Sequence, residues 1–192
     1  MNLAEIQRIL KTKTVGVAGC GGLGSNCAIA LARVGIGKLI IADFDIIEES
    51  NLNRQYFFYD QIGKVKSDTL KENIQEINKN INVESHNVFI EESNFHNIYK
   101  NCDLIIEAFD NTESKEMIVK AMNKHFPEKK LIMGIGIAGW GKNDIIKEIR
   151  LDNIIICGDN ETEVSDDLPP LAPRVGIVAN MQANVALELL LK

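Results

Sequence analysis

The sequence predicts an α/β fold of the Rossmann-like type: a mostly parallel sheet with helices on both faces and an antiparallel strand pair near the C-terminal end. Short apolar runs alternate with longer segments of helical period, which is typical of a parallel sheet covered by helices. A glycine-rich turn follows the first apolar run. The 192 residues, 45% hydrophobic and 25% charged, fit one globular domain, so we expect residues 1–192 to form a single unit.

Seven apolar runs predict the strands. The first five cover residues 14–18, 38–42, 82–87, 104–108 and 130–133. The last two, 145–150 and 153–157, flank Asp152-Asn153, a pair typical of tight turns, and are consistent with an antiparallel hairpin.

Five segments of helical period lie between these strands or flank them. They cover residues 3–10, 22–34, 65–78, 113–125 and 175–191. Apolar residues in the last segment recur at spacings of three and four, which predicts a packed helix and a candidate subunit interface. Residues 158–170 are acidic, contain two prolines and lack apolar period, so we expect a long surface loop with a functional or mobile role.

Composition narrows the function classes. The net charge of -6 argues against a nucleic-acid partner, because phosphate backbones are bound mainly by basic surface. The chain shows neither a secretory leader nor an apolar run of membrane-spanning length, so we expect a cytoplasmic protein with no membrane association. The four cysteines, Cys20, Cys27, Cys102 and Cys157, form no CxxC pair, so neither a disulfide framework nor a zinc site is predicted.

The glycine-rich turn is the first candidate ligand site. Gly19, Gly21, Gly22 and Gly24 fit the pattern GxGxxG directly after a predicted strand and at the start of a predicted helix. Such glycines allow a sharp turn, and the amides of the first helical turn attract phosphate. A tight turn without a ligand would use the same residues.

Asp43 ends the second predicted strand, where a carboxylate can accept both hydrogen bonds of a ribose diol. A nicotinamide-dependent enzyme would show the same pair of features. The cluster Ser50-Asn51-Leu-Asn53-Arg54-Gln55 favours a triphosphate instead, because charge that moves onto a leaving pyrophosphate needs cations. Arg54 can bind phosphate bidentately.

Lys66, at the start of a predicted helix, supplies a second positive charge, with Lys64 as the alternative if the register differs. A lone lysine here could also be simply solvated. Asp110 follows the strand 104–108 and is a candidate Mg²⁺ ligand, and Asn111 adds an amide beside it. The same two residues could also form a turn and cap the next helix.

Four motifs in this order, GCGGLGSN, DFDIIEESNLNRQ, KVKSD and FDN, resemble the ThiF/MoeB/HesA superfamily, the prokaryotic relatives of ubiquitin-activating enzymes. The short chain and its ending, PPLAPRVGIVANMQAN, are similar to the divergent ThiF branch associated with thiamine biosynthesis. The resemblance implies a single ATP-binding adenylation domain. It also implies that the glycine turn faces the triphosphate, that Asp43 holds the ribose, that Asp110 binds Mg²⁺, and that the phosphates contact Asn51, Arg54, Gln55 and Lys66.

In such proteins the C-terminal glycine carboxylate of a small ubiquitin-fold carrier attacks the α-phosphorus of ATP, which gives an acyl adenylate and pyrophosphate. The resemblance implies a ThiS-like sulfur carrier ending in Gly-Gly, a role in thiazole synthesis, and a homodimer. Carriers of molybdopterin or cysteine pathways remain alternatives, as do a nicotinamide-dependent oxidoreductase and a non-catalytic scaffold that binds a carrier. The carboxylate nucleophile, with a pKa of roughly 3.3 to 3.7, needs no general base.

The chain departs from many relatives in lacking two CxxC pairs, so zinc is not predicted. Arg8 is the only candidate to reach the ATP of a partner subunit, and a solvated helix arginine is the alternative. Cys157 is the best-placed candidate for a functional thiol, although its apolar neighbours would raise its pKa. The run 134–141 would either pass close to a partner or the carrier tail, or form a strand and turn with Trp140 in the core.

Overall fold

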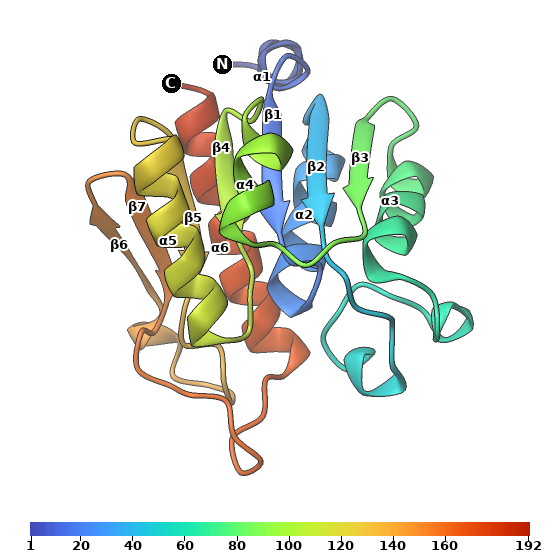
Figure 1. Ribbon diagram of the computed structural model, residues 1–192, viewed down its shortest axis with the longest axis vertical. Coiled ribbons are helices and arrows are strands. Elements are labelled where there is room, and N and C mark those ends of the chain that lie inside the picture. The colour runs from blue at the N-terminus through green and yellow to red at the C-terminus, as the bar shows by residue number, and fades with distance from the viewer.

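Seven strands form one sheet in the order β3-β2-β1-β4-β5-β7-β6 in the computed structural model, which describes residues 1–192 (Figure 1). All neighbouring strands are parallel except β6 and β7, which pair as the predicted antiparallel hairpin. The strands are β1 (Thr14–Ala18), β2 (Lys38–Ala42), β3 (Asn82–His86), β4 (Leu104–Glu107), β5 (Lys130–Gly134), β6 (Lys147–Leu151) and β7 (Ile154–Gly158).

Helices cover both faces of the sheet, as the sequence predicts. They are α1 (Leu3–Leu10), α2 (Gly22–Val34), α3 (Lys66–Ile77), α4 (Glu92–Tyr99), α5 (Thr112–His125) and α6 (Ala172–Leu190). Figure 1 shows α4 and α5 in front of the sheet and α2 and α6 behind it. No helix combines the length and the apolar composition that a bilayer crossing requires.

Two apolar layers hold the helices to the sheet, because successive strand side chains point to opposite faces. In β2, Leu39 and Ile41 belong to the layer shared with α2, α3 and α6, whereas Ile40 belongs to the layer shared with α4 and α5. The strands are almost continuously apolar because helices cover both faces of the sheet. The buried aromatic rings of Phe95 and Tyr99 fix α4 in the second layer.

Register brings the ends of the central strands to one edge. Ala18 of β1 lies opposite both Ala42 of β2 and Glu107 of β4. The loops that follow these three strands therefore start side by side, at the lower edge of the sheet in Figure 1. This edge is where open α/β sheets bind ligands.

One helix was not predicted from the sequence, and several observed boundaries differ from the predicted ones. Helix α4 was not expected, because its sequence ESNFHNIY is short and polar, although Phe95, Ile98 and Tyr99 have helical spacing and are buried. Residues 143–145, expected to lead into a strand, instead form a single 3-10 turn. Helix α6 begins before the expected residue 175, with a proline in its first turn, where the missing N–H costs nothing.

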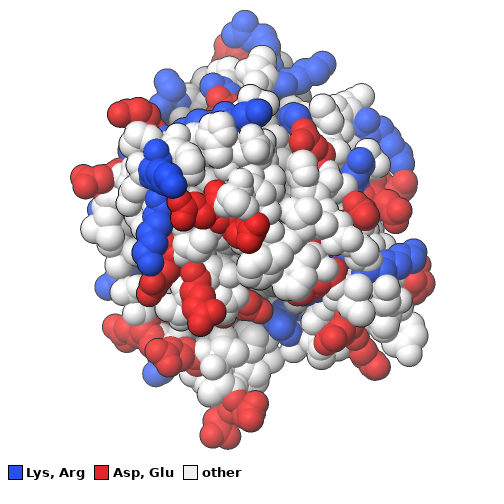
Figure 2. Space-filling view, viewed as in Figure 1, with Lys and Arg blue, Asp and Glu red and all other residues white.

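Charged side chains are interspersed over the face seen in Figure 2, which carries no continuous basic patch. Acidic side chains gather at its lower end, where Figure 1 shows the loop of residues 158–170. This segment has no helix or extended strand, as the sequence predicts, and its acidic residues are exposed apart from Asp159.

Candidate active site

The glycine turn requires glycine at two positions. Gly19 has a φ of 97°, and a Cβ atom there would lie 2.8 Å from the carbonyl oxygen of Ala108. A Cβ atom at Gly24 would lie 1.9 Å from the carbonyl oxygen of Gly19, so the helix packs directly onto the turn. At Gly21, by contrast, the nearest atom is the Gln55 side-chain nitrogen at 3.8 Å. Backbone atoms therefore pack closely against the turn at Gly19 and Gly24, whereas the turn has free space at Gly21.

Asp43 ties the glycine turn to the loop after β2. One of its carboxylate oxygens accepts a hydrogen bond from the Cys20 backbone nitrogen at 2.6 Å, and the other accepts one from the Asp45 backbone nitrogen at 2.8 Å. Burial raises the pKa of Asp43 above its usual value, while these two hydrogen bonds and the charge of Lys66 oppose the rise. Each oxygen keeps a further lone pair for a ribose hydroxyl.

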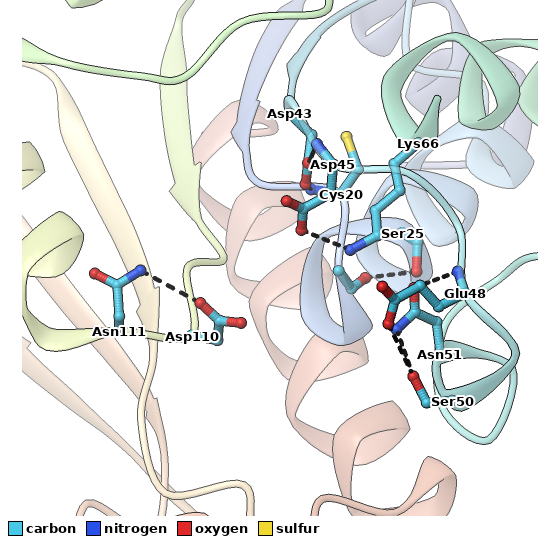
Figure 3. A network of polar contacts seen from close by, with 11 residues as sticks. Cys20, Ser25, Asp43, Asp45, Glu48, Ser50, Asn51, Lys66, Asp110 and Asn111 are labelled. Carbon is cyan, nitrogen blue, oxygen red and sulfur yellow. Dashed lines mark hydrogen bonds and ion pairs between the residues drawn. The ribbon is translucent and has the colours of Figure 1, made fainter. Parts of the chain in front are cut away.

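A pocket of about 210 Å³ opens beside this turn, and we call it the active-site pocket. Its lining brings together three charged residues that the sequence predicts as a site, Arg54, Lys66 and Asp110, from distant parts of the chain. Figure 3 shows Asp110 across the opening from Lys66. The full lining is Asp45, Ile46, Glu48, Asn51, Arg54, Gln55, Lys66 and Asp110.

Lys66 is the buried cation of this pocket. Only 6% of the residue is exposed, and its Nζ lies 2.8 Å from the Asp45 carboxylate. An ammonium group that has lost most of its water needs such an anionic partner. An incoming phosphate could take that place. Lys64, the alternative considered from the sequence, is exposed and does not line the pocket.

The segment around Arg54 lies over the glycine turn. The Arg54 Nη1 donates to the Ser50 carbonyl oxygen at 3.1 Å and to the Asn53 side-chain oxygen at 2.8 Å, which leaves its other donors available to a ligand. The Asn26 side-chain nitrogen, on α2, donates to the Arg54 carbonyl oxygen at 2.9 Å. The buried Oε1 atom of Gln55 has no hydrogen-bond partner, and a bound ligand could satisfy it.

Asp110 and Asn111 divide the two roles considered for them. The Asn111 side-chain oxygen accepts from the Ser114 backbone nitrogen at 2.8 Å and so caps α5. Asp110 is exposed at the pocket, and only a 3.3 Å contact from the Asn111 amide engages its carboxylate. No group of three or more His, Cys, Asp or Glu side chains forms a metal cage.

The sequence reasoning missed two groups. Asp45 and Glu48 line the pocket and lie within the same motif as Asp43, which is the signal that could have found them. Glu107 at the end of β4 is 0% exposed, and Lys115 of α5 approaches both its carboxylate oxygens at 2.8 Å. Burial raises the pKa of Glu107, and the Lys115 charge opposes this.

The Glu107–Lys115 pair fixes the segment that carries Asp110. Glu107 Oε1 also accepts from the Phe109 backbone nitrogen at 2.6 Å, and the Lys115 Nζ donates to the Gly134 carbonyl oxygen at 2.9 Å. Strands β4 and β5 and the start of α5 are thereby joined just before Asp110. A charged residue inside an otherwise apolar strand is the sequence signal for such a pair.

The structure shows where the three other residues considered from the sequence, Cys157, Trp140 and Arg8, lie. Cys157 is fully buried and burial raises its pKa to about 12, which favours a buried apolar role for this thiol over a functional one. Trp140 is 68% exposed, so the alternative that placed it in the core is wrong, and the glycine-rich run instead holds the ring at the surface. Arg8 lies on α1, at the end of the molecule opposite the active-site pocket of its own chain (Figure 1).

A family model described as the ThiF family matches residues 2–192. Ubiquitin-like modifier-activating enzyme 5 of Drosophila willistoni is 36% identical over 137 residues, which cover 65% of this chain and 34% of that protein. The molybdopterin-synthase adenylyltransferase of Haemophilus influenzae is 30% identical over 200 residues, which cover 97% of this chain and 78% of that protein. The chain spans about a third of the length of the modifier-activating relatives.

Among solved structures, E. coli tRNA N6-threonylcarbamoyladenosine dehydratase TcdA in complex with AMP superimposes with a TM-score of 0.87 at 20% identity. The match covers 97% of this chain and 89% of that chain. At this level of identity the likeness establishes a shared fold. The predicted Rossmann-like architecture is confirmed.

Proposed function

The chain belongs to the ThiF family, and from that premise we propose that it adenylates the C-terminal glycine carboxylate of a small ubiquitin-fold sulfur carrier. ATP is the second substrate, and the products are an acyl adenylate and pyrophosphate. The observation that carries the proposal is the convergence of Arg54, Lys66 and Asp110 on one pocket beside the glycine turn. Adenylyltransferase activity is also named for the Haemophilus influenzae relative, and the TcdA structure holds AMP.

The pocket supplies what this reaction needs most. The nucleophile is an anion that must approach a triphosphate, so the site has to neutralise charge and hold the reacting atoms in line. Arg54 binds phosphate oxygens with its planar fork, and Lys66 exchanges Asp45 for phosphate. The open face of the glycine turn at Gly21 lets phosphate approach backbone amides.

The other predicted site residues bind the remaining parts of ATP. Asp43 holds the ribose, Asn51 and Gln55 contact phosphates, and Asn111 orients Asp110 through their 3.3 Å contact. Asp110 would hold Mg²⁺, which would supply positive charge for the departing pyrophosphate. No side chain has to remove a proton, because the carboxylate is already ionised at neutral pH.

A ThiS-like carrier ending in Gly-Gly is the specific partner that we propose, with the sulfur delivered to the thiazole of thiamine. The chain's PPLAPRVG ending supports this choice, through its similarity to the short ThiF branch. A carrier of molybdopterin synthesis is the second candidate, because a relative that covers 97% of this chain is named for that pathway. The two proposals share the chemistry and differ only in the carrier.

A homodimer is part of the same proposal. Phe58, Tyr59 and Ile62 expose apolar surface on the loop that follows the Arg54 segment, and exposed apolar clusters mark interaction sites. Light scattering should give twice the chain mass of 21.4 kDa. A monomer at all concentrations tested would remove this part of the proposal and leave the adenylation chemistry unaffected.

Carrier-dependent exchange of pyrophosphate into ATP tests the proposed reaction. Purified ThiS-like and molybdopterin-type carriers are compared, each with a control carrier that lacks the last glycine. We expect exchange only with a complete Gly-Gly terminus, and faster exchange with the ThiS-like carrier. Carrier binding without exchange would favour the scaffold alternative, and exchange with the molybdopterin-type carrier alone would reassign the pathway.

A further inference from the structure

A second pocket of about 260 Å³ lies apart from the active-site pocket and shares none of its residues. We call it the Trp140 pocket. Its walls come from the loop after β5, the loop after β7 and the first turn of α6. The lining is Ala138, Gly139, Trp140, Lys142, Thr162, Leu168 and Arg174.

Arg174 gives this pocket a buried, positively charged group that other residues hold in place. The residue is only 3% exposed, its Nη2 pairs with the buried Asp159, and its Nη1 donates to the Gly141 carbonyl oxygen at 2.8 Å. Its Nε is buried and has no partner. A buried guanidinium donor left unpaired is costly, so a ligand acceptor at this position would be stabilised.

The charged side chains that line this pocket, Lys142 and Arg174, are both cationic. Both Asp159 oxygens are already occupied: one accepts from the Glu161 and Thr162 backbone nitrogens, and the other from the Thr162 hydroxyl and Arg174. Lys142 forms no ion pair and is exposed at the rim. Its charge is uncompensated, whereas Arg174 and Asp159 balance one another. The pocket therefore suits a carboxylate.

The other walls suit an apolar chain. Trp140 is 68% exposed, and its neighbours Gly139 and Gly141 have φ angles of 79° and 65°, a backbone that holds the indole outward. Gly139 is fixed by a hydrogen bond from its nitrogen to the Pro169 carbonyl oxygen at 2.9 Å. With Leu168 and Ala138, the indole gives an apolar surface beside the two cationic groups.

The loops that form the Trp140 pocket leave the sheet at the same edge as the loop that carries Asp110. Asp110 follows β4, while the pocket loops follow β5 and β7, the next two strands of the sheet. Strands lie about 4.8 Å apart, so the ends of β5 and β7 are roughly 5 and 10 Å from the end of β4, a span of up to about three extended residues. Figure 1 shows these loops at the same edge of the sheet.

We propose that the Trp140 pocket selects the carrier by binding an acidic side chain of its tail, about three to four residues before the terminal carboxylate. Lys142 and the Arg174 Nε hold the carboxylate, and Trp140 packs against the tail. This inference rests on the proposed carrier adenylation. Glu161 and Glu163 are exposed on either side of the wall residue Thr162, so the contacts of the ligand carboxylate with Lys142 and Arg174 have to outweigh their repulsion.

Fluorescence of the intact protein tests the site without turnover, because Trp140 is the only tryptophan. Synthetic peptides ending in Gly-Gly are titrated in the absence of ATP, with Glu or the isosteric Gln placed at each of the third to eighth positions from the end. We expect a saturable change in emission and at least tenfold tighter binding of the Glu peptide at the fourth or fifth position from the end. Equal binding of Glu and Gln peptides, or no response to any peptide, overturns the proposal.

Lys142→Ala provides the matched variant, and Lys147→Ala, an exposed lysine on β6 outside the pocket, provides the control. We expect Lys142→Ala to abolish the Glu preference and Lys147→Ala to retain it, both with unchanged ATP binding. A Glu preference that survives Lys142→Ala contradicts the assignment. Pyrophosphate exchange is measured separately, so loss of exchange with intact Glu selectivity would count against the adenylation chemistry and not against the pocket.

Discussion

At the scale of single residues, the site is organised around charges that are partly neutralised in advance. Lys66 forms an ion pair with Asp45, and the nearby Asp43 accepts hydrogen bonds from two backbone amides. A triphosphate entering the pocket therefore exchanges partners with groups already in position. Preorganised charge of this kind is worth more than the same charge in water, because it requires no rearrangement during the reaction.

Arg54→Ala should raise the barrier to pyrophosphate exchange by about 3 kcal/mol, which is roughly a hundredfold loss of rate. The reason is the loss of a bidentate donor to the charge that develops on the leaving group. Exchange rates at saturating carrier measure the effect. Arg33→Ala, an exposed arginine on α2, serves as the control and should keep the parental rate. A folded Arg54→Ala protein with parental exchange would show that the assigned role is wrong.

Residue types and their order predicted five of the residues that line the pocket, Asn51, Arg54, Gln55, Lys66 and Asp110, but not Asp45 and Glu48. They also did not show which side chains pair with one another. Asp45 and Lys66 are 21 positions apart, and only the fold shows that they form an ion pair. The same holds for Arg174 with Asp159, since burial decides that pairing. The sequence left open whether Trp140 lies in the core, because its hydrophobicity gave no sign that flanking glycines would turn it outward.

At the scale of elements, short strands and the loops that follow them determine where the site residues lie. The parallel strands were predictable to within one or two residues, because runs buried on both faces stand out from their surroundings. Helix α4 was not, because a two-turn helix with a polar sequence gains its stability from tertiary packing rather than from propensity. Its three buried side chains supply that packing.

Lys115→Met should lower the free energy of unfolding by about 3 kcal/mol, because it leaves Glu107 buried without its cation. Urea unfolding measures the change. Lys120→Met on the same helix is the control, since Lys120 pairs with Glu116 at the exposed surface and such pairs contribute less than about 1 kcal/mol. The double variant Glu107→Gln, Lys115→Met should recover part of the loss. Equal stability of the Lys115→Met and parental proteins would contradict the proposed anchoring role.

At the scale of the whole molecule, two pockets open at one edge of a single sheet. The strand order places the glycine turn, Asp110 and the Trp140 pocket in sequence from β1 through β4 to β5 and β7. The family resemblance predicted the first part of this arrangement. The second part depends on how the 158–170 loop and the start of α6 close around Arg174, which no local sequence pattern determines.

Mg²⁺ and ATP together should raise the melting temperature of the whole chain, because a ligand that binds only the folded state stabilises it by about 2.7 kcal/mol at a hundredfold excess over its dissociation constant. For a domain of this size, that corresponds to a rise of about 5–10 °C. The contribution of Mg²⁺ should vanish in Asp110→Asn, which retains the shape of the side chain but loses its charge. NAD at the same concentration is the control and should give no shift, because its diphosphate is esterified at both ends and lacks the terminal phosphates that the proposed cations bind. Stabilisation by NAD that persists in Arg54→Ala and Lys66→Ala, without a response to ATP, would instead favour a nicotinamide-dependent enzyme built on the same glycine turn and Asp43.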